Sequence, residues 1–472
     1  MTDVPLDQLD RFIQQRLAET HLPGLSLALV AGGRLVYARG YGFRDLERGR
    51  PMTPDTLVGV GSLTKSFTCL ALLQLQERGA LSVDDPVERY LPLPLRPHGE
   101  PVRIWHLMTH TSGLPALAYA EALIRHGVGA ADAWVPVATA QDMVTFLQGA
   151  EAWVHCRPGE RWFYLNEGYV LLGAIIEQVS GLPYPAYVRQ HILEPLGMRR
   201  SLFEADRFAA DDDTAVPYAV DRTGRAYPSR YLFGQISSDG GLISSAAEMA
   251  RYVLMYLLEG TLDGVRVATA ASVAAMHEPR VALPVRQRAA RGHGAAAAPD
   301  GQPAGFYGYG LHIFPGLLGG RVVGHGGSVR IATAHMAWVP EAGAGAVVLA
   351  NGTGYPLNQI ALYALAVLLG QDPRRLPFFE VEAVLRSLEG VYETYRGTMR
   401  ATVRRDGDYL RLEMGDRLND LTVVLVPRDL DPARPRFTAF AGGYELDATC
   451  RIDGDDAEIV YERYTFRRVG RL

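Results

Sequence analysis

The segment GSLTKSFTCLALLQLQERG, residues 61–79, places a serine and a lysine three positions apart at the start of a predicted helix. The run from Ser62 to Arg78 predicts the helix, and Gly79 ends it. This spacing puts Ser62 and Lys65 on one helical face, where their side chains can meet. Because the same spacing also arises by chance, an ordinary helix start with a solvated lysine remains the alternative for this segment alone.

A serine and a lysine at this spacing can act as a nucleophile and its base. A serine hydroxyl is a poor nucleophile unless a base takes its proton. A lysine can be that base only when its amine is uncharged, which burial or nearby positive charge promotes. The start of the helix adds partial positive charge and unpaired backbone N–H groups. The other groups of such a site must come from elsewhere in the chain.

Tyr164 and Asn166, separated by one leucine, are a second candidate pair. They precede a predicted helix over residues 169–179, and two residues spaced by one point to the same side of an extended segment. A phenol near a lysine can pass a proton, and an amide can hold a substrate carbonyl or orient the lysine. Taken alone, the pair equally fits a core tyrosine and a turn asparagine.

The third candidate is His325-Gly326-Gly327-Ser328, at the end of a strand-like run. Glycines let a substrate backbone approach a strand edge closely. The N–H of Ser328 could then donate to an oxyanion together with the N–H of Ser62. Taken alone, the segment equally fits a plain glycine turn.

Together, the three motifs in this order resemble those of the penicillin-recognising serine hydrolases, which include class C β-lactamases, DD-peptidases and related esterases. The resemblance extends over roughly residues 5–370. Four more segments fit the pattern of this family: RIWHLMTHTSGLP at 103–115, PGE at 158–160, GYVLLG at 168–173 and DGGLISS at 239–245.

The resemblance implies a role for each motif residue. Ser62 is the acylated nucleophile, and Lys65 is the base that activates it. Tyr164 is the second acid/base group, which passes a proton to the leaving group and helps to activate the hydrolytic water. The backbone N–H groups of Ser62 and Ser328 form the oxyanion hole. The residues implied to bind substrate are Asn166, His325, Gly327 and Ser328, with holding Lys65 as the alternative role of Asn166.

One departure from the family pattern bears on the substrate. Many relatives carry Lys-[Ser/Thr]-Gly where this chain has His325-Gly326-Gly327, so a fixed cation and a hydroxyl are lost. A histidine is mostly neutral at pH 7. His-x-Gly is similar to the motif of esterases and D-amino-acid peptidases, so we expect short esters or small peptides, including those with D-residues. A β-lactamase, or a non-catalytic binding protein with the same fold, is the alternative.

The strand pattern predicts an α+β fold. Apolar runs at 24–30 and 34–41 predict an early hairpin, and further strands are expected at 310–314, 321–324, 333–339 and 346–350. Helices are expected at 6–19, 246–258 and 358–369. The simplest arrangement is one antiparallel sheet from both groups of strands, flanked by helices as in β-lactamases and transpeptidases. The pocket walls are expected in loops such as 116–140, 205–235 and 284–305.

Residues 373–472 have a different sequence pattern from the rest of the chain. Eight short strand-like runs between 390 and 467, separated by turns, predict a small antiparallel β-barrel or sandwich. We therefore expect two domains, residues 1–372 and 373–472. The tail resembles the lipocalin-like barrel of some family members, which in certain relatives helps to build closed oligomers. This implies a homo-oligomer; a barrel that only supports the catalytic domain is the alternative.

Composition narrows the class of protein. The 472 residues are 48% hydrophobic and 21% charged, which excludes a disordered, collagen-like or coiled-coil chain. A net charge of −5 argues against a nucleic-acid partner and leaves small acidic or neutral substrates open. The partner that the family resemblance implies is a small-molecule ester or peptide. The N-terminus does not resemble a signal peptide, and no apolar stretch reaches the ~20 residues of a membrane span. We therefore expect no membrane partner and a cytoplasmic location.

Metal sites and cofactors are not expected. The three cysteines lack Cys-x-x-Cys spacing, which argues against a structural zinc site and against a disulfide framework. His106 and His110 have helical spacing but lack the glutamate of His-Glu-x-x-His, so we expect them to be structural. Residues 284–305, rich in Arg, Ala, Gly and Pro, are expected to form a mobile surface loop.

Overall fold

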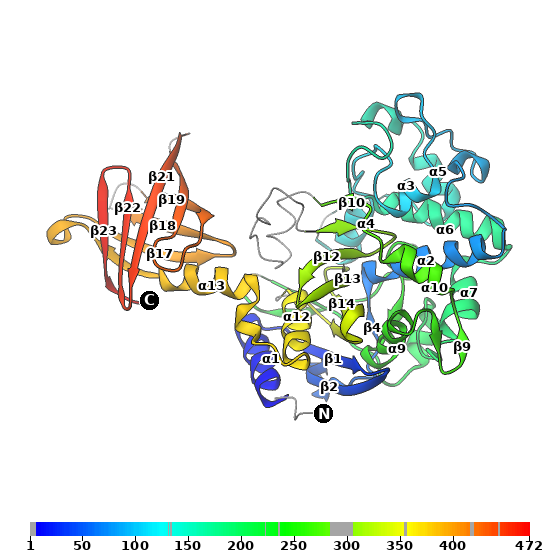
Figure 1. Ribbon diagram of the computed structural model, residues 1–472, viewed down its shortest axis with the longest axis horizontal. Helices are drawn as coiled ribbons and strands as arrows, with labels where there is room; N and C mark the ends of the chain where they lie inside the picture. Colours follow the sequence, from blue (N-terminus) through cyan, green and yellow to red (C-terminus); the bar gives the residue numbers. More distant parts are fainter. Residues whose placement is uncertain are drawn as a thin grey trace. The chain divides into compact units, whose positions relative to one another are not determined.

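The computed structural model describes residues 6–130, 132, 135–221, 223–234, 237–283, 305–353, 356–415, 420–441 and 444–472. Of the predicted surface loop at 284–305, all but Gly305 lies outside the described residues. The described chain forms two compact units, one that ends at Pro373 and one over Arg374–Leu472 (Figure 1).

A nine-stranded antiparallel sheet forms the centre of the first unit (Figure 1). Its strands are β1 (Gly24–Ala31), β2 (Arg34–Asp45), β3 (Arg50–Pro51), β10 (Val281–Ala282), β11 (Phe306–Tyr307), β12 (His312–Leu317), β13 (Gly320–Ser328), β14 (Thr333–Val339) and β15 (Ala344–Ala350). Their order is β10-β11-β12-β13-β14-β15-β1-β2-β3. The prediction that the early hairpin and the late strands share one antiparallel sheet is confirmed.

Helices cover both faces of this sheet. α9 (Ala246–Leu257) packs against β1, β14 and β15, and α12 (Leu357–Leu368) packs against β14 and β15. Successive residues of β15 point to opposite faces, and all seven are buried, so α9 and α12 lie on opposite sides. α1 (Leu6–Thr20) packs on α12, where the ring of Phe12 stacks on that of Tyr363.

Helix α2 (Thr64–Glu77), which follows Ser62, runs through the interior of the first unit. Twelve of its 14 residues are buried, and its apolar residues surround the helix, as is typical of a core helix. A polar side chain anywhere on α2 must therefore find its partners inside the protein. The other helices of this unit are α3 (Ile104–Met108), α4 (Tyr119–Gly127), α5 (Ala140–Phe146), α6 (Asn166–Ser180), α7 (Tyr184–Val188), α8 (Ala205–Ala210) and α10 (Ala270–Met276).

One predicted boundary near the candidate site is wrong. α6 begins at Asn166, whereas the sequence predicted a helix from 169. Leu165 is extended, so Tyr164 lies in the extended approach to the helix and Asn166 is its first helical residue. Short strand pairs that the sequence did not predict are β4 (Val58–Gly59) with β7 (Ile243–Ser244), β5 (Tyr218–Val220) with β6 (Ala226–Pro228), and β8 (Thr261–Leu262) with β9 (Val265–Arg266).

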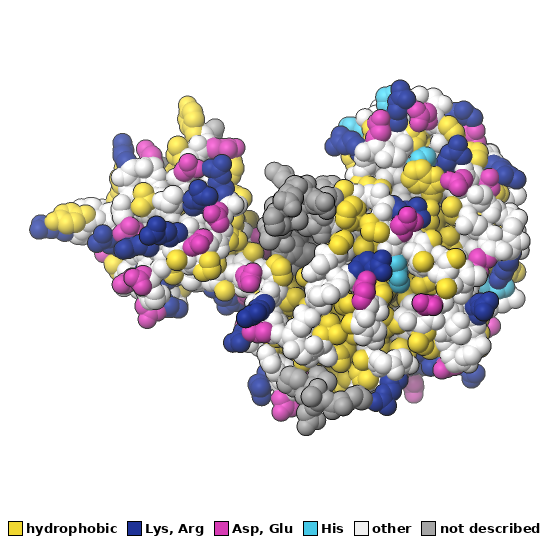
Figure 2. Space-filling model, in the orientation of Figure 1, with side chains coloured by type: hydrophobic (Ala, Val, Ile, Leu, Met, Phe, Trp, Pro, Cys, Tyr) yellow, Lys and Arg dark blue, Asp and Glu magenta, His cyan; other side chains and the backbone are white. Residues whose placement is uncertain are grey.

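The second unit is a closed antiparallel barrel, coloured orange to red in Figure 1. After α13 (Pro377–Ser387), its strands are β16 (Gly390–Glu393), β17 (Arg400–Asp406), β18 (Tyr409–Gly415), β19 (Asp420–Asp429), β20 (Arg436–Ala441), β21 (Tyr444–Asp453), β22 (Asp456–Tyr461) and β23 (Tyr464–Gly470). β23 pairs with β16 and closes the barrel, as the sequence predicted. Inward apolar residues such as Val403, Leu412 and Phe437 fill it. Figure 2 shows basic and acidic side chains interspersed on its outer surface.

In the part of the chain that the structure describes, no helix combines the length and the apolar character that a membrane crossing requires.

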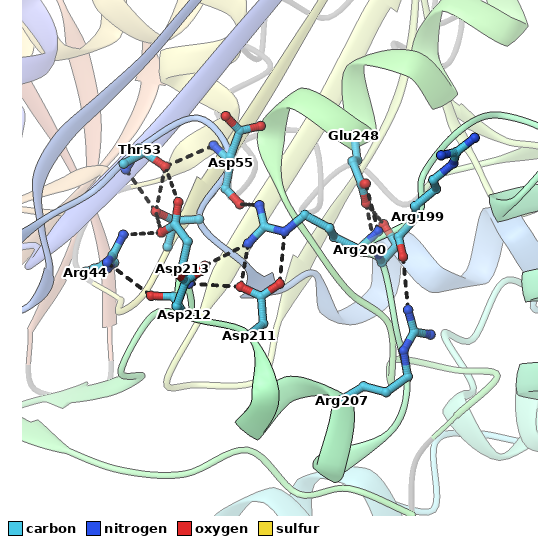
Figure 3. Close-up of polar contacts among 12 residues, drawn as sticks. Arg44, Thr53, Asp55, Arg199, Arg200, Arg207, Asp211, Asp212, Asp213 and Glu248 are labelled. Atoms are coloured by element: carbon cyan, nitrogen blue, oxygen red, sulfur yellow. Dashed lines mark hydrogen bonds and ion pairs between the residues drawn. The ribbon is translucent and has the colours of Figure 1, made fainter.

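A polar network ties together the segments that lead to Ser62 (Figure 3). The carboxylate of Asp213 accepts hydrogen bonds from the hydroxyls of Thr53 and Thr56, at 2.7 and 2.6 Å, and forms an ion pair with Arg44. The backbone N–H of Leu57, the residue before β4, donates to the carbonyl of Asp213. Asp213 thus fixes the chain a few residues ahead of the nucleophile candidate.

Arg200 extends this network on its other side (Figure 3). Its guanidinium donates to both oxygens of Asp211, at 2.9 and 2.6 Å, and to the backbone carbonyl of Asp55 at 2.6 Å. The backbone N–H of Arg200 donates to Glu248 on α9. The arginine holds the Asp211 carboxylate in its charged form and so lowers its pKa. The network therefore links α9 to the segment 53–57.

Replacing Asp213 with alanine should destabilise the fold. The Asp213→Ala change leaves three polar groups without their acceptor, so we expect the free energy of unfolding to fall by about 2–4 kcal/mol. Asp212→Ala is the matched control, because that neighbouring side chain is exposed and should change stability by less than about 0.5 kcal/mol. Urea unfolding measures both, and equal losses in the two variants would contradict the network's role.

Candidate active site

Ser62 lies in a tight turn at the start of α2. The turn spans Gly61–Leu63, and its entry is fixed because the N–H of Val60 donates to the carbonyl of Leu242. Gly61 has a φ of +54°, and a Cβ there would lie 2.8 Å from the backbone nitrogen of Ser328. Only glycine therefore allows the end of β13 to approach the turn this closely. Ser62 itself is half-buried.

Lys65 is completely buried one helical turn after Ser62. It is the only lysine in the sequence. Its Nζ lies 3.1 Å from Ser62 Oγ, 2.8 Å from Asn166 Oδ1 and 2.6 Å from the carbonyl oxygen of Asp239. The structure therefore brings the serine, the lysine and the asparagine together, as the motifs predicted.

The three partners of Lys65 differ in what they can do. The carbonyl of Asp239 and the amide oxygen of Asn166 only accept hydrogen bonds, so Nζ must donate to both. A hydroxyl can donate or accept. If the amine is uncharged, its two hydrogens go to these two oxygens and its lone pair faces Ser62 Oγ. Of the three partners, the Ser62 hydroxyl is the one that can give Lys65 a proton.

Tyr164 lies beside the same amine. Lys65 Nζ is 4.9 Å from the centre of the Tyr164 ring and 5.3 Å from that of Tyr169. The Tyr164 ring packs on the ring of His110 at 4.2 Å, and His110 Nδ1 accepts a hydrogen bond from the N–H of Leu165. His110 therefore holds the extended segment that carries Tyr164, which gives it the structural role predicted for it.

The end of β13 lies directly against the turn that carries Ser62. A Cβ added at Gly327 would overlap the carbonyl oxygen of Val60 and would lie 3.0 Å from the backbone nitrogen of Ser62. No side chain fits there, which explains the glycine. Ser328 follows, exposed, and its Oγ accepts a hydrogen bond from the N–H of Arg330. The backbones of Ser62 and Ser328 are thus neighbours, as a two-donor site requires.

His325 contacts protein groups on both ring nitrogens. Nδ1 lies 2.6 Å from the carbonyl oxygen of Gly326, and Nε2 lies 3.0 Å from the hydroxyl of Tyr307 on β11. A carbonyl only accepts, so Nδ1 carries a hydrogen. The ring is buried, and its centre lies 6.3 Å from that of Tyr164. The structure therefore places His325 next to Tyr164, whose ring lies beside Lys65 Nζ.

Two buried carboxyl groups, that of Asp239 and that of Glu167 next to Asn166, were not predicted as site residues. Asp239 Oδ2 accepts a hydrogen bond of 2.6 Å from the Tyr119 hydroxyl; burial raises the pKa of Asp239, and the Lys65 amine opposes this rise. Glu167 Oε1 accepts one of 3.2 Å from the N–H of Tyr119, and burial raises the pKa of Glu167 to about 7. Asp239 belongs to the matched segment 239–245, but Tyr119 belongs to no motif.

Among the described residues, no group of three or more His, Cys, Asp or Glu side chains could hold a metal ion. His106 Nδ1 accepts a hydrogen bond from the N–H of Arg103 at the start of α3. Burial, with Arg103 nearby, lowers the pKa of His106 to about 4. The ring is therefore a neutral helix cap. The three cysteines, Cys69, Cys156 and Cys450, are buried free thiols.

Comparison with protein families divides the chain into two parts. Residues 9–370 match a family described as Beta-lactamase. Residues 373–467 match a family described as Pab87 octamerisation domain.

Two curated relatives match parts of the chain. Protein flp of Staphylococcus aureus (strain MW2) is 30% identical over 223 residues, which are 47% of this chain and 42% of that protein. Penicillin-binding protein 4* of Bacillus subtilis (strain 168) is 31% identical over 260 residues, which are 50% of this chain and 53% of that protein. The chain spans about half the length of the curated relatives it matches.

Three solved structures share the fold. The octameric penicillin-binding protein homologue from Pyrococcus abyssi is 40% identical with a TM-score of 0.90, and the match covers 98% of this chain and all of that one. A penicillin-binding protein from Bacillus halodurans is 25% identical with a TM-score of 0.60, over 75% and 98% of the two chains. A D-stereospecific amidohydrolase from Streptomyces sp. gives the same identity and TM-score, over 76% and 98%.

Proposed function

This chain belongs to the β-lactamase family, and we propose that it is a serine hydrolase that works through an acyl-enzyme on Ser62. The observation that carries the proposal is the set of contacts around Lys65. Its Nζ has two acceptor-only partners, Asn166 Oδ1 and the carbonyl of Asp239, and one hydroxyl partner, Ser62. The amine is buried, so water does not compete for it.

Acylation begins when Ser62 Oγ attacks the substrate carbonyl carbon and its proton passes to Lys65 Nζ. The carbonyl oxygen becomes an oxyanion, which the N–H groups of Ser62 and Ser328 stabilise. The close approach of Gly61 and Gly327 supports this pairing of donors, because it brings the two backbones together.

Tyr164 returns the proton to the leaving group. Its ring lies beside Lys65 Nζ, which supports a path from the amine through the phenol. The bond between the carbonyl carbon and the leaving group breaks, the leaving group departs with the proton, and the acyl group stays on Ser62 Oγ as an ester. Water then attacks that ester with help from Tyr164, and the acid leaves while Ser62 regains its proton.

The substrates are short esters or small peptides, including those with D-residues. His325 supports this choice, since it replaces the lysine with a ring whose nitrogens already contact Gly326 and Tyr307. Similarity to a D-stereospecific amidohydrolase points in the same direction. A β-lactamase is the alternative, and nitrocefin turnover at a rate near that of esters would favour it.

We also propose that the second unit assembles the protein into a homo-oligomer. Its match to an octamerisation domain and the 40% identity to an octameric homologue over nearly the whole chain support eight copies.

Ser62→Ala should abolish ester hydrolysis. We expect p-nitrophenyl acetate turnover to fall by at least about 10³-fold, because the nucleophile is lost. Ser62 Oγ should attack the phosphorus of a fluorophosphonate and displace fluoride into solution, which adds the phosphonyl mass to the parent protein but not to Ser62→Ala. Ser387→Ala is the control, since that hydroxyl only donates to the carbonyl of Val384 in the second unit. Full turnover by folded Ser62→Ala, or an inert parent protein, would contradict the proposal.

The assembly is tested by native mass spectrometry of the full chain at micromolar concentration. We expect one main species with the mass of eight chains. A monomer over the whole concentration range would contradict the proposed assembly.

A further inference from the structure

An apolar pocket lies beside the segments that carry the candidate active site. It encloses about 490 Å³, a volume that includes the part open to solvent. Its walls come from the helix α4 and the residue after it, from the segment 230–233, and from the residues that flank the site. Its apolar side chains include Ile124, Val128, Leu232, Phe233, Leu242 and Val329.

Three stretches of backbone connect the pocket wall to residues of the candidate active site. Gly59, in its wall, precedes Ser62 by three residues. Gly240 directly follows Asp239, whose carbonyl binds Lys65 Nζ. Val329 directly follows Ser328, whose backbone nitrogen lies against Gly61. The pocket wall therefore contains residues that are one to three positions in the sequence from Ser62, Asp239 and Ser328.

The walls offer an apolar environment. The hydroxyl of Tyr231 accepts a hydrogen bond of 3.1 Å from the N–H of Gly59. The ring of Tyr231 forms part of the pocket wall. That ring packs so close to Gly59 that a Cβ there would lie 2.7 Å from it. Arg230 also lines the pocket, but it is exposed, so its aliphatic stem can cover apolar surface while the guanidinium stays in water.

We propose that this pocket binds the apolar part of the substrate's acyl group, so that the enzyme prefers a medium-length aliphatic or hydrophobic amino-acyl donor. The inference rests on the proposed acyl-enzyme function and adds a substrate class to it. Apolar surface that leaves water in the transition state raises kcat/KM, because its burial stabilises the reacting complex relative to free enzyme and substrate.

A series of p-nitrophenyl esters with the same leaving group tests the proposal. From acetate through butyrate to hexanoate, we expect kcat/KM to rise by about fourfold for each methylene group that becomes buried. Acetates of longer alcohols, which place the apolar chain on the leaving group, should show no such rise. A rise confined to the alcohol series would overturn the assignment to the acyl group.

Val128→Trp should remove the preference by filling the pocket. Val128 is half-buried just after α4, so the larger ring can enter the pocket without disturbing the interior. We expect hexanoate kcat/KM to fall by at least about tenfold while acetate changes by less than about twofold. Val265→Trp is the matched control, because that valine on β9 is exposed and outside the pocket lining, and it should change neither ester.

The outcomes separate this inference from the proposed function. If acetate is hydrolysed and Ser62 is labelled, but chain length has no effect, the pocket proposal is wrong and the serine hydrolase stands. The same holds if Val128→Trp affects acetate and hexanoate equally. If no ester reacts and a fluorophosphonate leaves Ser62 unlabelled, the proposed function itself fails.

Discussion

The arrangement of the candidate site depends on the hydrogen-bond partners of one buried lysine side chain. An amine without water must find its partners in the protein, and Lys65 finds them on three separate segments. The turn before α2 supplies Ser62, the start of α6 supplies Asn166, and the chain before β7 supplies the carbonyl of Asp239. The contacts of one amine therefore bring together parts of the chain that are more than 170 residues apart. The Ser62 hydroxyl is the third partner of that amine.

Two glycines and one carboxylate extend this arrangement outward. Gly61 and Gly327 let the backbone of β13 lie against the Ser62 turn, so the backbone nitrogens of Ser62 and Ser328 are neighbours. Asp213 anchors residues 53–57, from which the chain enters that turn. Residues one to three positions from the proposed reacting groups also line the apolar pocket. In the proposed function, position and specificity therefore come from the same short segments.

Much of this site was predictable because most of its contacts are made by side chains, whose identities can be read directly from the sequence. Ser62 and Lys65 are close in the sequence, so helix geometry alone brings them together, and the Tyr164 and Asn166 motif is readable by resemblance. The Asp239 contact was not predictable, since it uses a backbone carbonyl that every residue possesses. Tyr307, the partner of His325, sits on a two-residue strand too short to leave a pattern. The sheet was predictable because its strands are apolar runs, whereas the start of α6 was misplaced by three residues.

The central claim is that Lys65 takes the proton from Ser62, and the rate at which a fluorophosphonate labels Ser62 tests it most directly. Arginine keeps a positive charge and hydrogen-bond donors but cannot accept a proton, whereas methionine removes the charge at similar length. With folding checked by circular dichroism, the account predicts that Lys65→Arg and Lys65→Met both label at least about 100-fold more slowly than the parent. Labelling of Lys65→Arg at the parent rate would contradict it.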